Sequence, residues 1–363
     1  MRQLEHLCEY ELDLTTLSPL FIGSGETVGK FEYIYEPKKK TVTFIKRELF
    51  FRYLLEHNLV EEYEKFALGH GGKDLGRFLK SRCRVTEDQI SAFAFAEMDA
   101  ADALDQDHSL KDIHTFICRT DGTIYVPGSS VKGCLRTILL TDMLLRDEKL
   151  NRTAFPKNPK GNASNCESLE QRYLHLLQLS SKQENAVNDI MRGISVSDSE
   201  PVDEHDMILC SKIDLHVNDD VNYINVVRQC IRPQTKIRFR LTLDQSVVKD
   251  KITVAAIRKA IENFDRFYRE TYNVKYIDSL YNEDVPFVIL GGGNGYFSKN
   301  LVYPFYKDER EKAVKEVSKI LQKKFSKHKH EQDIEIGISS RVEKITEYKG
   351  EQYGFGICKA EII

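Results

Sequence analysis

The stretch Ile124-Tyr-Val-Pro-Gly-Ser-Ser-Val-Lys-Gly-Cys-Leu-Arg-Thr137 decides how this chain folds. Its first three residues predict a short strand, which the following Pro-Gly pair breaks. Ser129 is a suitable N-cap for a helix that continues in apolar residues through Leu145. A helix start offers free backbone N–H groups and the positive end of a dipole, so the stretch predicts an anion-binding corner.

Four polar side chains of this stretch are candidate ligands for a phosphate. Lys132 and Arg136 lie four residues apart, so both extend from one side of the predicted helix near its start. Ser129 and Ser130 are small and keep the approach open. The alternative is a capped core helix that carries two basic residues. A Walker P-loop is excluded, because Cys134 stands where that motif requires lysine.

Composition limits the classes of function. The chain has 363 residues, enough for two domains, and its net charge is −3, from 53 basic and 56 acidic residues. Any nucleic-acid binding must therefore come from local patches. The eight cysteines form no C-x-x-C pair and no zinc-ligand spacing, so we expect neither a metal nor another cofactor. No apolar run is long enough to span a membrane and no signal peptide is evident, so we expect a cytoplasmic protein.

The order of predicted elements favours an α+β fold. Polar–apolar alternation predicts strands, and apolar residues at helical spacing predict helices. We expect two ferredoxin-like (RRM-like) domains with antiparallel sheets, residues 1–231 and 232–363, with largely helical insertions at about 56–115 and 150–190. The predicted strands are residues 9–14, 192–197, 207–216, 236–243, 287–290 and 354–362, with a hairpin at 31–44; the main later helices are 169–179, 251–271 and 309–325.

One predicted strand has a basic face. Ile237, Phe239 and Leu241 point one way, whereas Lys236, Arg238 and Arg240 point the other. This row of cations suits either plain exposure to solvent or contact with a polyanion, and the sequence leaves both possibilities open.

A glycine-rich loop, Gly291-Gly-Gly-Asn-Gly295, follows the strand at 287–290. It lacks the spacing and the following helix of a dinucleotide-binding loop. Its backbone N–H groups can approach an extended phosphate backbone closely, with Tyr296 and Phe297 available for stacking and Lys299 for charge. The alternative is a glycine-rich turn at a strand end.

Three segments together resemble the repeat-associated mysterious protein (RAMP) superfamily of CRISPR systems. They are Val126–Arg136, Leu290–Gly295, and Leu17-Ser-Pro-Leu-Phe-Ile-Gly-Ser-Gly25. The resemblance implies RNA contacts at Gly23, Ser24, Gly25, Ser129, Ser130, Lys132, Arg136, Gly291, Gly292, Gly293, Asn294, Gly295, Tyr296 and Lys299. We therefore expect that reversing the charges of Lys132 and Arg136 leaves the fold intact and lowers RNA retention.

Within this superfamily the chain is similar to the fifth Csm subunit of type III-A effector complexes, on its length, the segment Ser195–Ser199 and its ending. That resemblance implies a non-catalytic RNA-binding subunit that caps the complex at the 3′ end of the CRISPR RNA (crRNA) and supports its maturation in antiviral defence. The implied partners are the guide RNA, the repeated Csm backbone subunit, the small helical Csm subunit and host nucleases.

Two alternatives remain open. One is a RAMP endoribonuclease that processes CRISPR RNA, which would need a general acid or base. His205 and His216 flank a predicted strand and His6 precedes the first one, but none of the three sits in a recognisable catalytic motif. The other is an assembly subunit without direct RNA contact.

Overall fold

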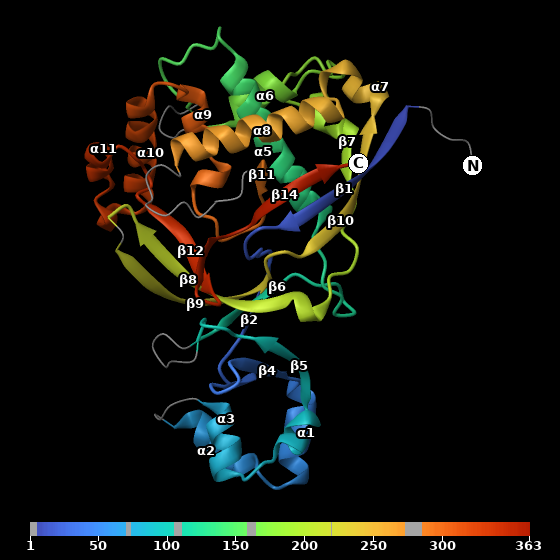
Figure 1. The fold of residues 1–363 in the computed structure, drawn as a ribbon, viewed down its shortest axis with the longest axis vertical. Coiled ribbons are helices and arrows are strands. Elements are labelled where there is room, and N and C mark those ends of the chain that lie inside the picture. The colour runs from blue at the N-terminus through green and yellow to red at the C-terminus, as the bar shows by residue number, and fades with distance from the viewer. Residues whose placement is uncertain (1–5, 70–73, 105–110, 158–164, 219, 273–284) are drawn as a thin grey trace.

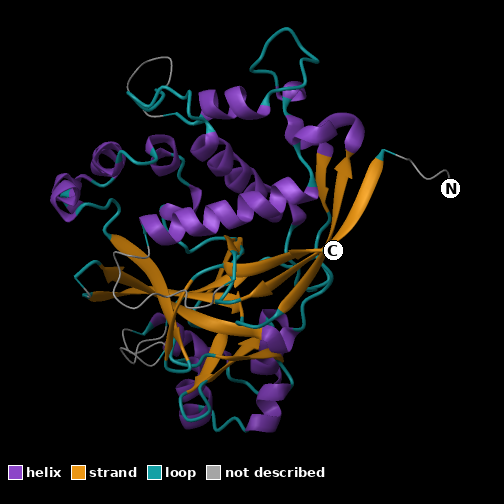
Figure 2. Ribbon diagram, turned by 45° about the horizontal axis from the view of Figure 1, so that its top comes forward, coloured by secondary structure: helices purple, strands orange, loops and turns teal. Residues whose placement is uncertain are grey.

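A computed structural model describes residues 6–69, 74–104, 111–157, 165–218, 220–272 and 285–363. Helices cover one side of a pair of sheets, and a small lobe extends from the other end of the molecule (Figures 1 and 2). Among the described residues, no helix has the length and apolar character needed to cross a membrane.

The elements follow one another in this order. The strands are β1 Leu7–Thr16, β2 Gly23–Val28, β3 Tyr33–Glu36, β4 Thr41–Ile45, β5 Ala94–Asp99, β6 Ile113–Phe116, β7 Ile194–Val196, β8 Met207–His216, β9 Val221–Ile231, β10 Lys236–Asp244, β11 Phe287–Ile289, β12 Val342–Tyr348, β13 Glu351–Gly354 and β14 Ile357–Ile362. The α-helices are α1 Arg47–Glu56, α2 Val60–Leu68, α3 Leu75–Arg77, α4 Glu87–Ser91, α5 Gly128–Arg146, α6 Glu167–Leu174, α7 Gln245–Val248, α8 Val254–Thr271, α9 Val302–Tyr306, α10 Arg310–Lys324 and α11 Asp333–Ile336.

The first sheet has the strand order β11-β14-β1-β10-β7, and all its neighbours are antiparallel. β1 lies in the middle, where Leu12 and Leu14 are buried opposite Phe239 and Ile237 of β10. Helices α5 and α8 cover this sheet (Figure 1). The amphipathic pattern predicts α8 from residue 251; the helix begins at Val254, and the Thr253 side chain caps it by accepting a hydrogen bond from the Ala256 N–H.

The second sheet has the order β2-β6-β9-β8-β5-β4-β3, with β12 paired to β8 and β13 paired to β12. Most of its pairs are antiparallel, but β5–β8 and β6–β9 are parallel. The α+β class with antiparallel-containing sheets is thus confirmed. Both sheets take strands from either side of residue 231, so a domain boundary there stays a prediction that the sheets do not mark.

The prediction that residues 56–115 are largely helical is wrong in part. Helices α2 to α4 lie there, together with a π-helical turn at Phe78–Arg82, but so do β5 and β6. β5 pairs with β4 and, at one residue pair, with β8, so sheet pairing overrides the helix-forming composition of Ala94–Asp99. The lobe has a core of its own, with Phe50, Leu54 and Phe93 at its centre.

Other predicted elements differ in extent. Ile124 forms only an isolated bridge with Cys118, so Ile124–Val126 is no regular strand. The helix predicted at 169–179 ends at Leu174, as part of a second insertion that is mostly non-helical among its described residues. The hairpin of β12 and β13 was not predicted at all.

The basic face of β10 is neutralised within the protein. Asp13 of β1 is buried, and its carboxylate pairs with Lys236 Nζ at 2.6 Å and Arg238 Nε at 3.0 Å. Glu11 and Glu9 continue the row as partners of Arg238 and Arg240. The structure therefore favours a cross-strand charge ladder over a free polyanion-binding face.

Acid should weaken this ladder at Asp13. Burial opposes ionisation, but hydrogen bonds from Arg238 and Lys236 and their positive charges win, and the pKa of Asp13 lies below its ordinary value of 3.8. The stabilisation is therefore complete above pH 3.8 and is lost as pH falls through the lower folded-state pKa. Asp13→Asn is expected to cost about 1–3 kcal/mol of unfolding free energy at pH 7. The difference in unfolding free energy between Asp13→Asn and wild type should shrink as pH falls through the folded-state pKa of Asp13.

The measurement is urea unfolding of wild type and Asp13→Asn between pH 7 and pH 2.5. Glu9→Gln is the matched control, because Glu9 is exposed and lies 4.0 Å from Arg240, and it should change stability by less than about 0.5 kcal/mol. Equal stability of Asp13→Asn and wild type at pH 7 would contradict the ladder.

Candidate nucleic-acid interface

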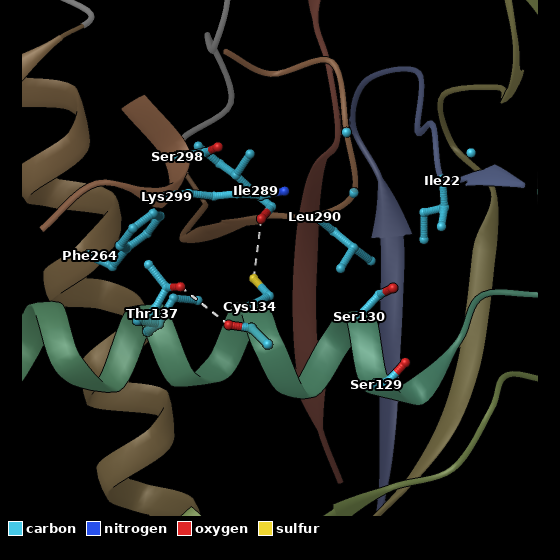
Figure 3. A pocket seen from close by; sticks show the side chains of 15 residues that line it. Ile22, Ser129, Ser130, Cys134, Thr137, Phe264, Ile289, Leu290, Ser298 and Lys299 are labelled. Atoms are coloured by element: carbon cyan, nitrogen blue, oxygen red, sulfur yellow. Dashed lines mark hydrogen bonds between the residues drawn. The ribbon is translucent and has the colours of Figure 1, made fainter. Parts of the chain in front are cut away.

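Three segments that are far apart in the sequence meet around a cavity of about 440 Å³ (Figure 3). They are the residues leading into β2, the start of α5, and the loop after β11. The lining residues are Ile22, Gly23, Ser129, Ser130, Gly133, Cys134, Thr137, Ile138, Phe264, Ile289, Leu290, Gly291, Gly292, Ser298 and Lys299. Residues from all three RAMP-like segments therefore share one site.

One face of α5 forms a wall of the cavity. Ser130, Gly133 and Thr137 follow one another at helical spacing and line the cavity. Figure 3 shows Ser130 and Thr137 on the side of α5 that faces β11. The Cys134 thiol donates a hydrogen bond to the Ile289 carbonyl oxygen at 3.2 Å. Burial raises the pKa of Cys134 to about 12, so this thiol is an inert packing group.

The N-terminus of α5 is occupied by the protein's own carboxylate. The helix begins at Gly128, whose N–H donates a hydrogen bond to Asp198 Oδ1 at 3.0 Å. The prediction that Ser129 is the N-cap is therefore wrong, because an acceptor from a distant segment fills that role. Ser129 lies inside the first turn, exposed at the cavity.

Lys132 and Arg136 lie on the same side of α5, as predicted, but neither lines the cavity. Arg136 bridges two carboxylates, Glu170 at 2.5 Å and Asp189 at 2.6 Å. Burial lowers the pKa of Lys132, although the nearby charge of Asp189 opposes the shift. The structure thus ties Arg136 to the packing of α5 against α6 and the residues before β7, and RNA contact by either residue stays a prediction.

Replacing Arg136 should therefore cost stability, contrary to the expectation that its charge can be reversed freely. Arg136→Gln is expected to lower the unfolding free energy by about 1–3 kcal/mol, because two carboxylates lose a half-buried partner. Lys132→Gln, which breaks no ion pair of the described residues, should stay within about 0.5 kcal/mol. Chemical denaturation of both variants tests this difference, and equal stabilities would contradict it.

The glycine-rich loop packs with its backbone against the residues before β2. The Gly292 N–H donates a hydrogen bond to the Phe21 carbonyl oxygen at 2.8 Å. Gly291 has a φ of +80°, and a side chain there would overlap that same oxygen. The positive φ and the close approach at Gly291 both require glycine, so this loop is more than a flexible turn.

The rest of the loop turns away from the cavity. Asn294 is buried, and its side chain donates to the Leu290 carbonyl and accepts from the Ser298 hydroxyl at 2.8 Å, so it holds the loop in shape. Gly293 and Gly295 have positive φ and do not line the cavity.

The two aromatic residues after the loop are mostly covered. Phe297 is buried and stacks on Tyr272 with ring centroids 4.2 Å apart, so the prediction that it is available for stacking is wrong. Tyr296 is half-buried against the core, and burial raises its pKa. Lys299 is exposed and brings a cation to the cavity.

Gly23, Ser24 and Gly25 belong to β2. Gly23 lines the cavity, whereas Ser24 and Gly25 lie further along the strand. The Ser24 hydroxyl is 2.6 Å from that of Thr115 in β6.

Several residues at or beside the cavity were not predicted from the sequence. Gly133 and Thr137 follow Ser129 and Ser130 on the same helix face, so helical spacing within the quoted stretch could have found them. Arg228 of β9 lies between the rings of Phe21 and Phe355, 5.1 and 5.3 Å from their centres, beside Gly293. No local pattern marks Arg228, because the strand pairing alone brings it there.

The three candidate histidines do not come together. His6 precedes β1, His205 is exposed before β8 and His216 ends β8, and none lines the cavity. In the described ranges, no group of three or more His, Cys, Asp or Glu side chains is placed to hold a metal ion.

Comparison with known proteins fits this arrangement. The RAMP superfamily matches residues 13–359, and the chain therefore belongs to the RAMP superfamily. Its similarity to the fifth Csm subunit is also confirmed. The "CRISPR system Cms protein Csm5" of Mycobacterium tuberculosis is 27% identical over 98% of both chains. The protein of the same name from Streptococcus thermophilus is 26% identical over 88% of this chain and 84% of its own.

Two solved structures share the fold. One is a chain in a cryo-EM structure of a Csm–crRNA–target RNA ternary complex of a type III-A CRISPR–Cas system, with a TM-score of 0.65 and 17% identity; the match covers 97% of this chain and all of that one. The other is the crystal structure of T. onnurineus Csm5, with a TM-score of 0.62 and 15% identity over 96% and 99% of the two chains.

Proposed function

We propose that this chain is the Csm5-type subunit of a type III-A CRISPR effector complex, and that it holds the 3′ region of the guide RNA at the end of that complex. In this role it supports maturation of the RNA end and antiviral defence in the cytoplasm. The observation that carries the proposal is the meeting of three RAMP-like segments at one cavity. The near full-length similarity to relatives named Csm5 supports it.

The chemistry of the cavity suits an RNA backbone. The hydroxyls of Ser129 and Ser130 and the backbone of Gly291 and Gly292 supply hydrogen-bonding groups, and Lys299 supplies one positive charge. Such groups position phosphates without reading sequence. Apolar side chains from α5, α8 and β11 form the remaining wall, against which a sugar or base can pack. The guide RNA is accordingly the principal ligand.

The partners follow from this role. The repeated Csm backbone subunit and the small helical Csm subunit are the neighbours we propose, and host nucleases trim the RNA end. The chain itself binds without cleaving.

Gly133 offers a direct test of the cavity. It is exposed on the cavity face of α5, and a side chain there would enter open space. Gly133→Glu should place a bulky negative group in the cavity and lower guide-RNA occupancy of the reconstituted complex about tenfold, with little change in melting temperature. Gly133→Ala is the matched control, which should keep the RNA and gain about 0.5–1 kcal/mol from higher helix propensity.

Occupancy and RNA length are measured on complexes purified with each variant. Normal occupancy and normal length with Gly133→Glu would reject the cavity as an RNA site. Loss of the whole subunit from the complex, with RNA still bound, would instead favour an assembly role.

The purified chain is expected not to cleave CRISPR repeat RNA, with or without magnesium. His6, His205 and His216 lie on separate elements and do not face the cavity, so none is placed as its general acid or base. Gel analysis of labelled repeat RNA is the measurement. Specific cleavage that disappears in His205→Ala or His216→Ala would establish the endoribonuclease alternative.

A further inference from the structure

A second site candidate lies at the C-terminal end of α10. Residues 323–329, Lys-Lys-Phe-Ser-Lys-His-Lys, are all exposed and contain four lysines and no acid. Phe325 is 43% exposed, although a phenylalanine would ordinarily be buried. None of these residues lines the cavity, and in Figure 1 α10 and α11 form the side of the molecule opposite the N-terminal end of β1.

The ring of Phe325 is held in place by its neighbours. It stacks on the His328 ring with centroids 5.5 Å apart and planes 16° from parallel. Lys324 Nζ lies 5.5 Å from the centre of the Phe325 ring. This is an aromatic surface framed by positive charge.

Hydrogen bonds fix the backbone of this segment. Gln322 Nε2 donates to the Ser326 carbonyl at 2.9 Å, and Arg341 donates to the His328 carbonyl at 2.7 Å. At its far end, the Ser318 hydroxyl donates to the carbonyl of buried His330 at 2.6 Å. The exposed ring and lysines are therefore presented on an ordered turn, which reduces the entropy lost on binding.

The positive charges are not neutralised locally. In the part of the chain that the structure describes, no carboxylate lies within ion-pair distance of Lys324, Lys327 or Lys329. By contrast, Lys312 at the start of α10 pairs with Glu309. An exposed ring flanked by unpaired cations fits single-stranded nucleic acid, because a base stacks on the ring while its phosphates meet the lysines.

We propose that residues 323–329 form a second contact for single-stranded RNA, in which a base stacks on Phe325 and the backbone runs past Lys324, Lys327 and Lys329. This site is separate from the cavity and stands without it. An acidic segment of a partner protein is the competing occupant, but it would not need the flat face of an aromatic ring.

The test measures binding of fluorescein-labelled oligouridine, about 12 nucleotides long, to the purified full-length chain by anisotropy at several salt concentrations. Phe325→Leu should weaken binding about tenfold, in the range of one lost stacking contact. Phe325→Trp should retain it. Lys324→Gln with Lys327→Gln should lower the log–log salt slope by about 1.4, or about 0.7 for each phosphate contact. The matched control is Lys38→Gln with Lys251→Gln, two exposed lysines elsewhere, which should change neither value.

Three results would each overturn the proposal. Phe325→Leu could bind RNA as tightly as wild type, the lysine control could lose as much affinity as the test variants, or the wild-type chain could fail to bind at low salt. The proposal would also be overturned by unchanged RNA binding combined with lost capture of partner subunits by Phe325→Leu, which would assign the segment to a protein. Gly133→Glu separates the two sites. Loss of RNA binding only in Gly133→Glu rejects this second contact and keeps the proposed function. Loss of RNA binding only in Phe325→Leu rejects the cavity as an RNA site and keeps the second contact.

Discussion

The cavity depends on direct contact between backbone segments, which is possible only where the residue is glycine. A side chain on Gly128 would overlap the Val196 carbonyl, and one on Gly291 would overlap that of Phe21. The first contact sets the start of α5 against β7. The second sets the loop after β11 against the residues before β2. If either approach were lost, the three segments would no longer surround one site, whatever their polar residues.

Charge pairing then decides which cations remain for a polyanion. The sequence offers Arg136, Arg238 and Lys236 as candidate contacts for a polyanion. In the structure each of them is paired with carboxylates of the same chain. Lys299 and the lysines at 324–329 are exposed. With a net charge of −3, the chain has no general attraction for RNA, so the position of a few unpaired cations matters more than their total.

The sequence predicts most strongly what is periodic and local. Alternation in β1 and β10 and the apolar stripes of α8 and α10 give these elements with small errors at their ends. β5 could not be predicted, because Ala94–Asp99 is rich in helix formers and only pairing with β4 makes it a strand. The hairpin of β12 and β13 turns at Lys349-Gly350, where both φ values are positive, and lysine is not a residue that marks such a turn.

For the site, the motifs themselves were visible, but their surroundings were not. Gly23, Ser129, Ser130, Gly291, Gly292 and Lys299 lie at one cavity. Whether Phe297 is free depends on Tyr272 of a neighbouring segment, and whether Arg136 is free depends on Glu170 and Asp189. These contacts depend on the tertiary structure, and no local sequence pattern contains them.

The small number of exposed cations has a physical consequence for the proposed function. At a physiological Debye length of about 8 Å, a few local cations act only on RNA that is already close. A subunit of this kind gains useful affinity when an assembly holds the RNA end nearby at high effective concentration, and it binds free RNA weakly. Under the proposed function, assembly therefore adds to the weak RNA binding of the purified chain.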